Sequence, residues 1–246
     1  MALLAQCSNP PSAAAELLAH GRFVRLHVYR PQDGVQRLAL LLSGDGGWGS
    51  MLGSIAQRLT LGGTLVAGID SRQLLSSLSR DPASCVSPGA DLAELSAYLQ
   101  QRYQLAPAAP VLIGHSAGAS LAFVALAQSS AGTFSGALTL SFCAELDLAK
   151  PLCRTRAVRY SARAGGVRLL PAGPLPAPWT ALHALDDTEC PAADGQAFAA
   201  AIPGARFVGL PGLTHSYHHM NRWWEQFETA YLQLAAMPAA PASPAR

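Results

Sequence analysis

A strand–turn–helix pattern around one serine constrains this chain more than any other feature. The apolar run 111–113 leads into Gly114-His115-Ser116-Ala117-Gly118, and the small-residue segment that follows predicts a helix over 117–128. Glycines two residues before and two after a serine keep a tight turn free of side-chain clashes. The pattern predicts that Ser116 sits on a strained turn that lifts its hydroxyl above a sheet edge, where it can act as a nucleophile. An ordinary serine in a tight turn is the alternative.

Composition and charge favour one α/β domain. The chain has 246 residues, of which 50% are hydrophobic and 13% charged. This balance suits buried parallel strands that are covered by helices on both faces. The net charge of +2 is too small to indicate a nucleic acid partner. No apolar run has the length of a transmembrane helix.

Predicted strands and helices alternate along the chain. We expect strands at 23–30, 38–42, 64–69, 111–113, 137–142, 179–185 and 206–210, and helices at 51–59, 88–103, 117–128, 191–201 and 220–235. The alternation predicts a doubly wound, mostly parallel sheet, with 23–30 as an edge strand. We expect residues 143–178 to be irregular and to form no large lid. The expected domain is 21–236, between a flexible segment at 1–20 and a disordered Pro/Ala-rich tail at 237–246.

Two aspartates beyond the nucleophile are candidates for the acid of a catalytic triad. A serine hydroxyl needs a base, and that base needs a third group to orient it. In doubly wound sheets such groups gather at the carboxyl ends of the strands. Asp186 and Asp187 end the strand segment that contains His183. Asp187 is the first choice, and Asp186 is the alternative because strand ends are hard to place.

The base candidate follows the last predicted strand. Leu210-Pro211-Gly212-Leu213-Thr214-His215 ends that strand in a turn that carries a histidine. His215 is the first choice, with His218 and His219 as fallbacks if the loop is longer. A metal site formed by the three histidines is a weaker alternative, since no cysteine or carboxylate is close in sequence. We expect neither a metal nor a cofactor.

An oxyanion hole requires two backbone N–H groups near the nucleophile. Ala117 supplies one, and the glycine-rich loop 43–48 supplies the other through Asp45. The acidic side chain of Asp45 either caps the helix near Met51 or faces the pocket and meets a cation. The cap is the favoured interpretation. We expect His115 to be packed, with its side chain pointing away from the site.

Two further clusters in the sequence carry an interpretation. Five arginines in the irregular segment form either a patch for anionic headgroups or an ordinary exposed face of a strand, namely Arg154, Arg156, Arg159, Arg163 and Arg168. Four cysteines besides Cys7 allow three pairings, namely Cys85, Cys143, Cys153 and Cys190. Cys143 and Cys153 flank a short loop, and Cys85 and Cys190 both follow predicted strand ends. Two disulfides would indicate an oxidising compartment, and buried thiols are the alternative.

Several motifs together resemble the VirJ/AcvB family of bacterial virulence proteins. The resemblance spans about residues 23–235. It rests on Ser-Gly-Asp-Gly-Gly-Trp at 43–48, Gly-Ile-Asp-Ser at 68–71, Gly-His-Ser-Ala-Gly-Ala at 114–119, Cys190-Pro191, and Leu-Pro-Gly-x-x-His at 210–215. It implies an α/β-hydrolase fold and a periplasmic location. Residues 1–7 are apolar but lack the basic segment of an intact signal peptide, so we expect a leader to be absent or trimmed.

The resemblance also implies a substrate, the aminoacyl ester of lysyl- or alanyl-phosphatidylglycerol. Its hydrolysis would use Ser116, His215 and Asp187. Asp45 or Asp70 would hold the substrate ammonium, and the arginine segment would face the phosphate or an anionic membrane surface. Some family members are connected to type IV secretion, which implies a secretion-system partner. The alternatives are a carboxylesterase or thioesterase for small acyl groups, and a periplasmic secretion-accessory binding protein with a vestigial site.

Overall fold

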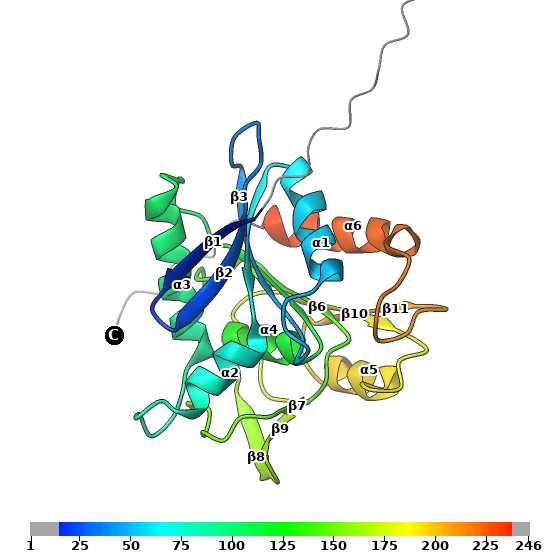
Figure 1. Ribbon diagram of the computed structural model, residues 1–246. Coiled ribbons are helices and arrows are strands. Elements are labelled where there is room, and N and C mark those ends of the chain that lie inside the picture. Colours follow the sequence, from blue (N-terminus) through cyan, green and yellow to red (C-terminus); the bar gives the residue numbers. More distant parts are fainter. Residues whose placement is uncertain (1–14, 238–246) are drawn as a thin grey trace, which may run out of the picture.

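An eight-stranded sheet organises the chain (Figure 1). The computed structural model describes residues 15–237. The strand order is β1-β2-β4-β3-β5-β6-β10-β11, with β1 and β2 antiparallel to their neighbours and the other pairs parallel. Its strands are β1 (Glu16–His20), β2 (Phe23–Tyr29), β3 (Arg37–Leu42), β4 (Thr64–Ile69), β5 (Val111–His115), β6 (Gly136–Leu140), β10 (Trp179–Ala184) and β11 (Arg206–Leu210). The predicted doubly wound parallel sheet is confirmed.

Helices cover both faces of this sheet. The first face carries α1 (Ser50–Leu61) and α6 (Trp224–Ala235). The second carries α2 (Ser71–Ser79), α3 (Pro88–Arg102), α4 (Ala117–Gln128) and α5 (Ala192–Ala200). Leu40 faces the second layer of helices and Leu41 the first, because successive side chains of a strand point to opposite faces. Both are fully buried, which explains why β3 is apolar without alternation.

The structure differs from the sequence-based expectations near the first strands. Residues 16–20, predicted to be flexible, form β1, and residues 1–14 of the predicted flexible segment lie outside the described residues. Strand β2 is therefore an inner strand, whereas we predicted an edge strand. Helix α2 was not predicted because its sequence is rich in serine, a weak helix former. The Asp70 side chain begins it by accepting the backbone N–H of Gln73 at 3.0 Å.

The segment predicted to be irregular contains a second, three-stranded antiparallel sheet. It consists of β7 (Glu145–Leu146), β9 (Gly166–Leu170) and β8 (Arg159–Arg163), in that order. Gly166 makes the close pairing possible, because a Cβ there would lie 2.0 Å from the carbonyl oxygen of Leu146. The end of the chain also differs from the prediction: a 3₁₀ turn, η1 (Met220–Arg222), precedes α6.

Two disulfides connect the described residues, and they select one of the three pairings that the sequence left open. Cys85 is bonded to Cys153, and Cys143 to Cys190. The second pair forms because β6 and β10 are parallel neighbours, so the residues that follow their carboxyl ends lie close together. The first pair lies beside a parallel bridge between Val86 and Leu152. No helix within residues 15–237 is long and apolar enough to cross a bilayer.

Candidate active site

Ser116 occupies a strained turn between β5 and α4. Its backbone has φ 55° and ψ −123°, a conformation that non-glycine residues rarely adopt. The flanking glycines are required by close contacts. A Cβ at Gly114 would lie 2.1 Å from the carbonyl oxygen of Gly118, and one at Gly118 would lie 2.2 Å from that of Ser43. The turn therefore holds the serine at the carboxyl end of the central strand, against the loop that follows β3.

Asp187 lies in the loop after β10 and is fully enclosed by hydrogen-bond donors. Its Oδ1 accepts the backbone N–H groups of Glu189 and Cys190, each at 2.9 Å. Its Oδ2 accepts the Ser141 hydroxyl at 2.5 Å and His215 Nδ1 at 2.8 Å. Burial raises the pKa of Asp187, but the hydrogen bonds from Ser141, Cys190 and His215 outweigh it and place the pKa below its ordinary value. The carboxylate is thus charged and fixed.

His215 lies in the loop after β11 and is oriented by Asp187. Because a carboxylate accepts from Nδ1, the proton of the neutral imidazole resides on Nδ1 and leaves Nε2 as the acceptor. This is the tautomer that a general base needs. The alternative acid, Asp186, is exposed and makes no described contact with His215; its backbone N–H bonds to the carbonyl oxygen of Leu213.

His115, the residue before Ser116, contacts His215. Its Nε2–H donates to the backbone carbonyl of His215 at 2.9 Å, and the two rings are 4.9 Å apart. His115 is packed, as predicted, but it points toward the base loop and not away from the site. Burial lowers the pKa of His115 to about 4, so the ring is neutral near pH 7. Within the described chain no hydrogen bond joins Ser116 Oγ to His215, a contact that often tightens only when substrate binds.

The glycine-rich loop after β3 lies over the nucleophile. Gly44 and Gly47 close a turn through a 3.1 Å hydrogen bond, and a Cβ at Gly44 would lie 3.3 Å from that of Ser116. Asp45 occupies the exposed corner of this turn. The favoured interpretation, that its side chain caps the following helix, is wrong: α1 begins after Gly49 without a side-chain cap. The turn leaves the Asp45 N–H free of the closing bond, and Ala117 N–H lies at a helix start, where backbone donors lack helical partners.

Asp70 contacts this loop, and Trp48, the last residue of the loop, packs on the sheet. Besides capping α2, Asp70 reaches Gly47, where a Cβ would lie 3.0 Å from Asp70 Oδ2. Trp48 covers Gly68 of β4, at which a Cβ would lie 2.2 Å from the indole ring. It also stacks on His27 at 5.0 Å between ring centroids. The carboxylate of Asp70 thus has a role in the fold, and its predicted contact with a substrate ammonium stays a prediction.

Sequence reasoning missed several supports of the acid. Ser141 has φ 52° and donates to Asp187, while the Tyr217 hydroxyl lies 3.1 Å from Ser141 Oγ. His183 donates from Nε2 to the carbonyl of Cys190 at 2.8 Å, and Gly195 of α5 leaves room for that imidazole. Burial lowers the pKa of His183, which keeps it neutral. The positive φ of Ser141 and the tertiary origin of these contacts leave no local signal in the sequence.

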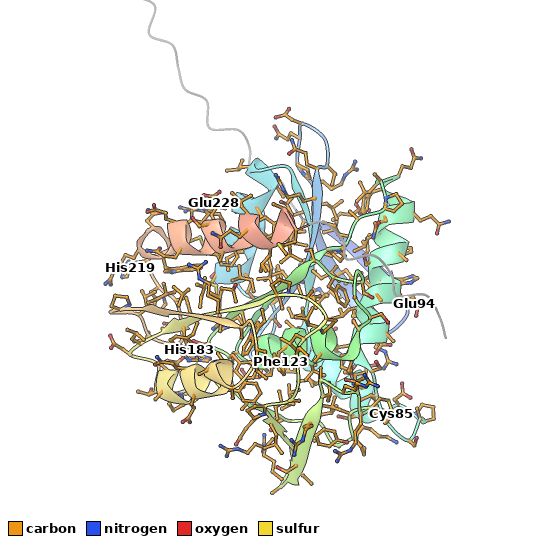
Figure 2. All side chains as sticks on the ribbon, turned by 180° about the vertical axis from the view of Figure 1, so that it is seen from behind. Cys85, Glu94, Phe123, His183, His219 and Glu228 are labelled. Carbon is orange, nitrogen blue, oxygen red and sulfur yellow. A yellow bond between two sulfur atoms is a disulfide. The ribbon has the colours of Figure 1, made fainter. Side chains whose placement is uncertain are left out.

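The remaining candidates lie elsewhere. His218 and His219 are exposed beyond the base loop, and Figure 2 shows His219 at the periphery, beside α6. Among residues 15–237 no group of three or more His, Cys, Asp or Glu is arranged to hold a metal ion.

Within the arginine cluster, Arg163 forms ion pairs with Glu145 and Asp147, and Arg168 forms one with Glu145. Arg154 stacks over Tyr160.

Comparison with known proteins agrees with the fold and with the sequence resemblance. Residues 36–134 match the model of a family described as bacterial virulence protein (VirJ), which confirms the resemblance. The match includes the glycine-rich loop and Ser116 but ends before Asp187 and His215. A search of curated proteins finds no match to the chain.

Solved structures of esterases share the fold at low sequence identity. The chain resembles Est1E from Butyrivibrio proteoclasticus with a TM-score of 0.61 and 14% identity, covering 91% of this chain and 100% of the other. Esterase Est2 from Thermogutta terrifontis has a TM-score of 0.62 and 16% identity, and the match covers 95% of this chain and 98% of the other. An esterase domain from Rhodothermus marinus has a TM-score of 0.57 and 15% identity, and the match covers 89% of this chain and 96% of the other. The architecture is that of the α/β-hydrolase fold.

Proposed function

We propose that this protein is a serine ester hydrolase that uses Ser116, His215 and Asp187. The observation that carries the proposal is the 2.8 Å hydrogen bond from His215 Nδ1 to the buried Asp187, beside a serine on a strained elbow. An imidazole oriented in this way leaves Nε2 free to accept a proton. The elbow and the loop above it supply the backbone donors that acyl transfer requires.

Each step follows from these groups. His215 Nε2 takes the proton of Ser116 Oγ as the oxygen attacks the acyl carbon, and the N–H groups of Ala117 and Asp45 stabilise the oxyanion. Collapse breaks the ester bond, and His215 returns the proton to the leaving alcohol. Water then attacks the acyl-enzyme with His215 as base, which releases the acid and restores Ser116. Asp187 stays charged and stabilises the imidazolium.

We further propose the aminoacyl ester of lysyl- or alanyl-phosphatidylglycerol as the substrate. The match to the VirJ family over the glycine-rich loop and the nucleophile supports this choice. The exposed Asp45 is an acidic group beside the nucleophile, which suits a substrate with an ammonium next to the scissile carbonyl. Arg159 at the start of β8 and Arg156 in the turn before it are exposed and would face an anionic membrane surface.

The location that we propose is the periplasm. Two disulfides among the described residues support an oxidising compartment, because such bonds are rare where thiols are kept reduced. Contact with a secretion system is proposed only on the family resemblance.

Replacement of the nucleophile tests the activity. Ser116→Ala should lower kcat for a p-nitrophenyl ester by about 10³-fold or more, since the hydroxyl forms the covalent intermediate. A fluorophosphonate probe should label the wild type and fail to label the variant. If the wild type resists the probe and hydrolyses no ester, the protein is a binding protein with a vestigial site.

Lipid analysis tests the substrate. Vesicles that contain lysyl- or alanyl-phosphatidylglycerol should lose the aminoacyl lipid and gain phosphatidylglycerol and free amino acid, as measured by mass spectrometry. The Ser116→Ala variant is the control. Turnover of small neutral esters or thioesters with no change in the lipids would favour the general esterase instead.

A further inference from the structure

A second carboxylate faces His215 from the solvent side. Glu189 Oε2 lies 3.6 Å from His215 Nε2, the nitrogen that must exchange a proton with Ser116. The side chain of Glu189 is 72% exposed, whereas that of His215 is 13% exposed. Asp187 binds the opposite edge of the same ring, at Nδ1. The two carboxylates therefore differ in kind: one is buried and orients the ring, and the other stands before its reactive nitrogen.

The backbone of Glu189 is fixed although its side chain is exposed. Its N–H and that of Cys190 both donate to Asp187 Oδ1, and the carbonyl of Cys190 accepts from His183. The disulfide to Cys143 ties this short loop to the end of β6. The backbone of Glu189 thus has a defined position relative to the base, and its exposed side chain retains the freedom to turn toward a ligand.

No arginine or lysine of the described chain forms an ion pair with Glu189. Its one charged contact is with His215, whose charge exists only when the ring is protonated. With a neutral imidazole, an exposed anion therefore stands at the site without a counterion. A cation that binds there gains a charge-assisted contact and displaces little more than water.

We propose that Glu189 is the residue that determines specificity for acyl groups carrying a cationic amino group. The inference rests on the proposed ester hydrolysis. During attack, Nε2 lies within about 3 Å of Ser116 Oγ, which is bonding to the acyl carbon. An amino group on the α-carbon is two bonds from that acyl carbon. A carboxylate 3.6 Å from Nε2 is consequently within contact range of an α-ammonium.

Other carboxylates near the site fit this role less well. Asp70 uses Oδ1 to cap α2 and Oδ2 to contact Gln73 Nε2 at 3.3 Å. Asp186 is exposed but makes no described contact with His215. Asp45 is exposed on the opposite loop, and its backbone belongs to the proposed oxyanion hole. Glu189 alone among these has its carboxylate oxygen within 4 Å of the base.

Comparing two esters that differ only in an ammonium group isolates the effect of the substrate's charge. The p-nitrophenyl esters of alanine and of isobutyric acid have the same acyl skeleton, with an ammonium in one where the other has a methyl group. Glu189→Gln should lower kcat/KM for the alanyl ester by about tenfold and leave the isobutyryl ester within about twofold, because one charge-assisted contact is lost. Asp186→Asn, three residues away, removes a charge of the same sign and should alter neither value by more than about twofold.

The outcomes separate the inference from the proposed function. Equal loss on both esters would assign Glu189 to the catalytic machinery and overturn the specificity role. No loss on either ester in Glu189→Gln would also overturn the specificity role, while activity that depends on Ser116 would leave the proposed hydrolase function standing. Loss of the alanyl preference in Asp45→Asn but not in Glu189→Gln would move the role to Asp45. Failure of the wild type on both esters would overturn both proposals.

Discussion

At the scale of single residues, the site depends on histidines whose roles are set by their surroundings. His215 and His115 are neighbours in space, yet one is oriented by a carboxylate and the other is buried against a backbone carbonyl. The first is the proposed base, because Asp187 holds Nδ1 and leaves Nε2 for the proton of Ser116. The second is kept neutral by burial and fixes the backbone of the first.

Burial of His115 makes the stability of the protein depend on pH. The pKa of His115 is lowered from 6.5 to about 4 in the folded chain. Between these values the unfolded chain binds a proton that the folded chain does not, so stability is full above about pH 6.5 and falls as the pH drops toward 4. His115→Gln keeps a donor for the His215 carbonyl and should reduce this loss by about 2 kcal/mol at pH 4.5.

Urea unfolding at pH 7.5 and pH 4.5 measures the effect. His218→Gln is the matched control, since His218 is exposed on the same loop and should leave the pH dependence unchanged. The same pH dependence in wild type and His115→Gln would show that His115 is not the group responsible.

At the scale of elements, the site is assembled where four loops meet at the carboxyl ends of β3, β5, β10 and β11. The elbow helix α4 approaches the loop after β3 so closely that only glycine fits at position 118. This contact brings the proposed oxyanion donors of the two loops together. The two glycines of the serine motif therefore serve packing between elements as well as the turn itself.

A methyl group at position 118 should push α4 and the loop after β3 apart. Gly118→Ala places a Cβ 2.2 Å from the carbonyl oxygen of Ser43, so the helix or the loop must move. We expect a loss of about 1–3 kcal/mol in the free energy of unfolding and a fall in kcat of about tenfold or more, as one oxyanion donor shifts. Thermal unfolding and ester turnover measure the two effects.

Gly173→Ala is the control for this variant. Position 173 is exposed, and its nearest contact would be an ordinary 3.8 Å approach to the carbonyl oxygen of Arg156. It should change neither stability nor turnover appreciably. A fully stable and active Gly118→Ala protein would contradict the proposed contact.

At the scale of the whole molecule, two disulfides close long loops with different relations to the site. Cys85–Cys153 spans 68 residues and fastens the start of α3 to the segment before β8. Cys143–Cys190 spans 47 residues and fastens the loop that holds Asp187. Both restrict the unfolded chain, but only the second fixes a part of the proposed triad.

Removal of each disulfide should separate stability from activity. The variants Cys85→Ala/Cys153→Ala and Cys143→Ala/Cys190→Ala should each lose about 2–5 kcal/mol of stability. Only the second should also lower kcat, by about tenfold or more, because Asp187 loses a fixed hydrogen-bond partner. Turnover measured well below both unfolding midpoints checks this, and equal turnover in the two variants would contradict it.

The sequence by itself determined the elements whose signals are local. Apolar runs defined the parallel strands, Ser87 and Pro88 marked the start of α3, and the glycines around Ser116 marked the elbow. Chain order also brought Asp187 and His215 forward as candidates, since both follow strands. Strand β1 and the second sheet were harder to predict. Strand β1 is partly exposed, and the second sheet is short and rich in arginine, so neither has a strong apolar pattern.

Only the tertiary structure decided which of these residues meet. Strand order placed Cys143 beside Cys190, the loop after β10 enclosed Asp187 and left Asp186 in solvent, and the same loop set Glu189 before His215. The physical reason is that such contacts join residues far apart in the chain through packing and hydrogen bonding, which no local pattern records. The proposed nucleophile lies in five consecutive residues, whereas its proposed base, its proposed acid and the Glu189 carboxylate come together only in the folded sheet.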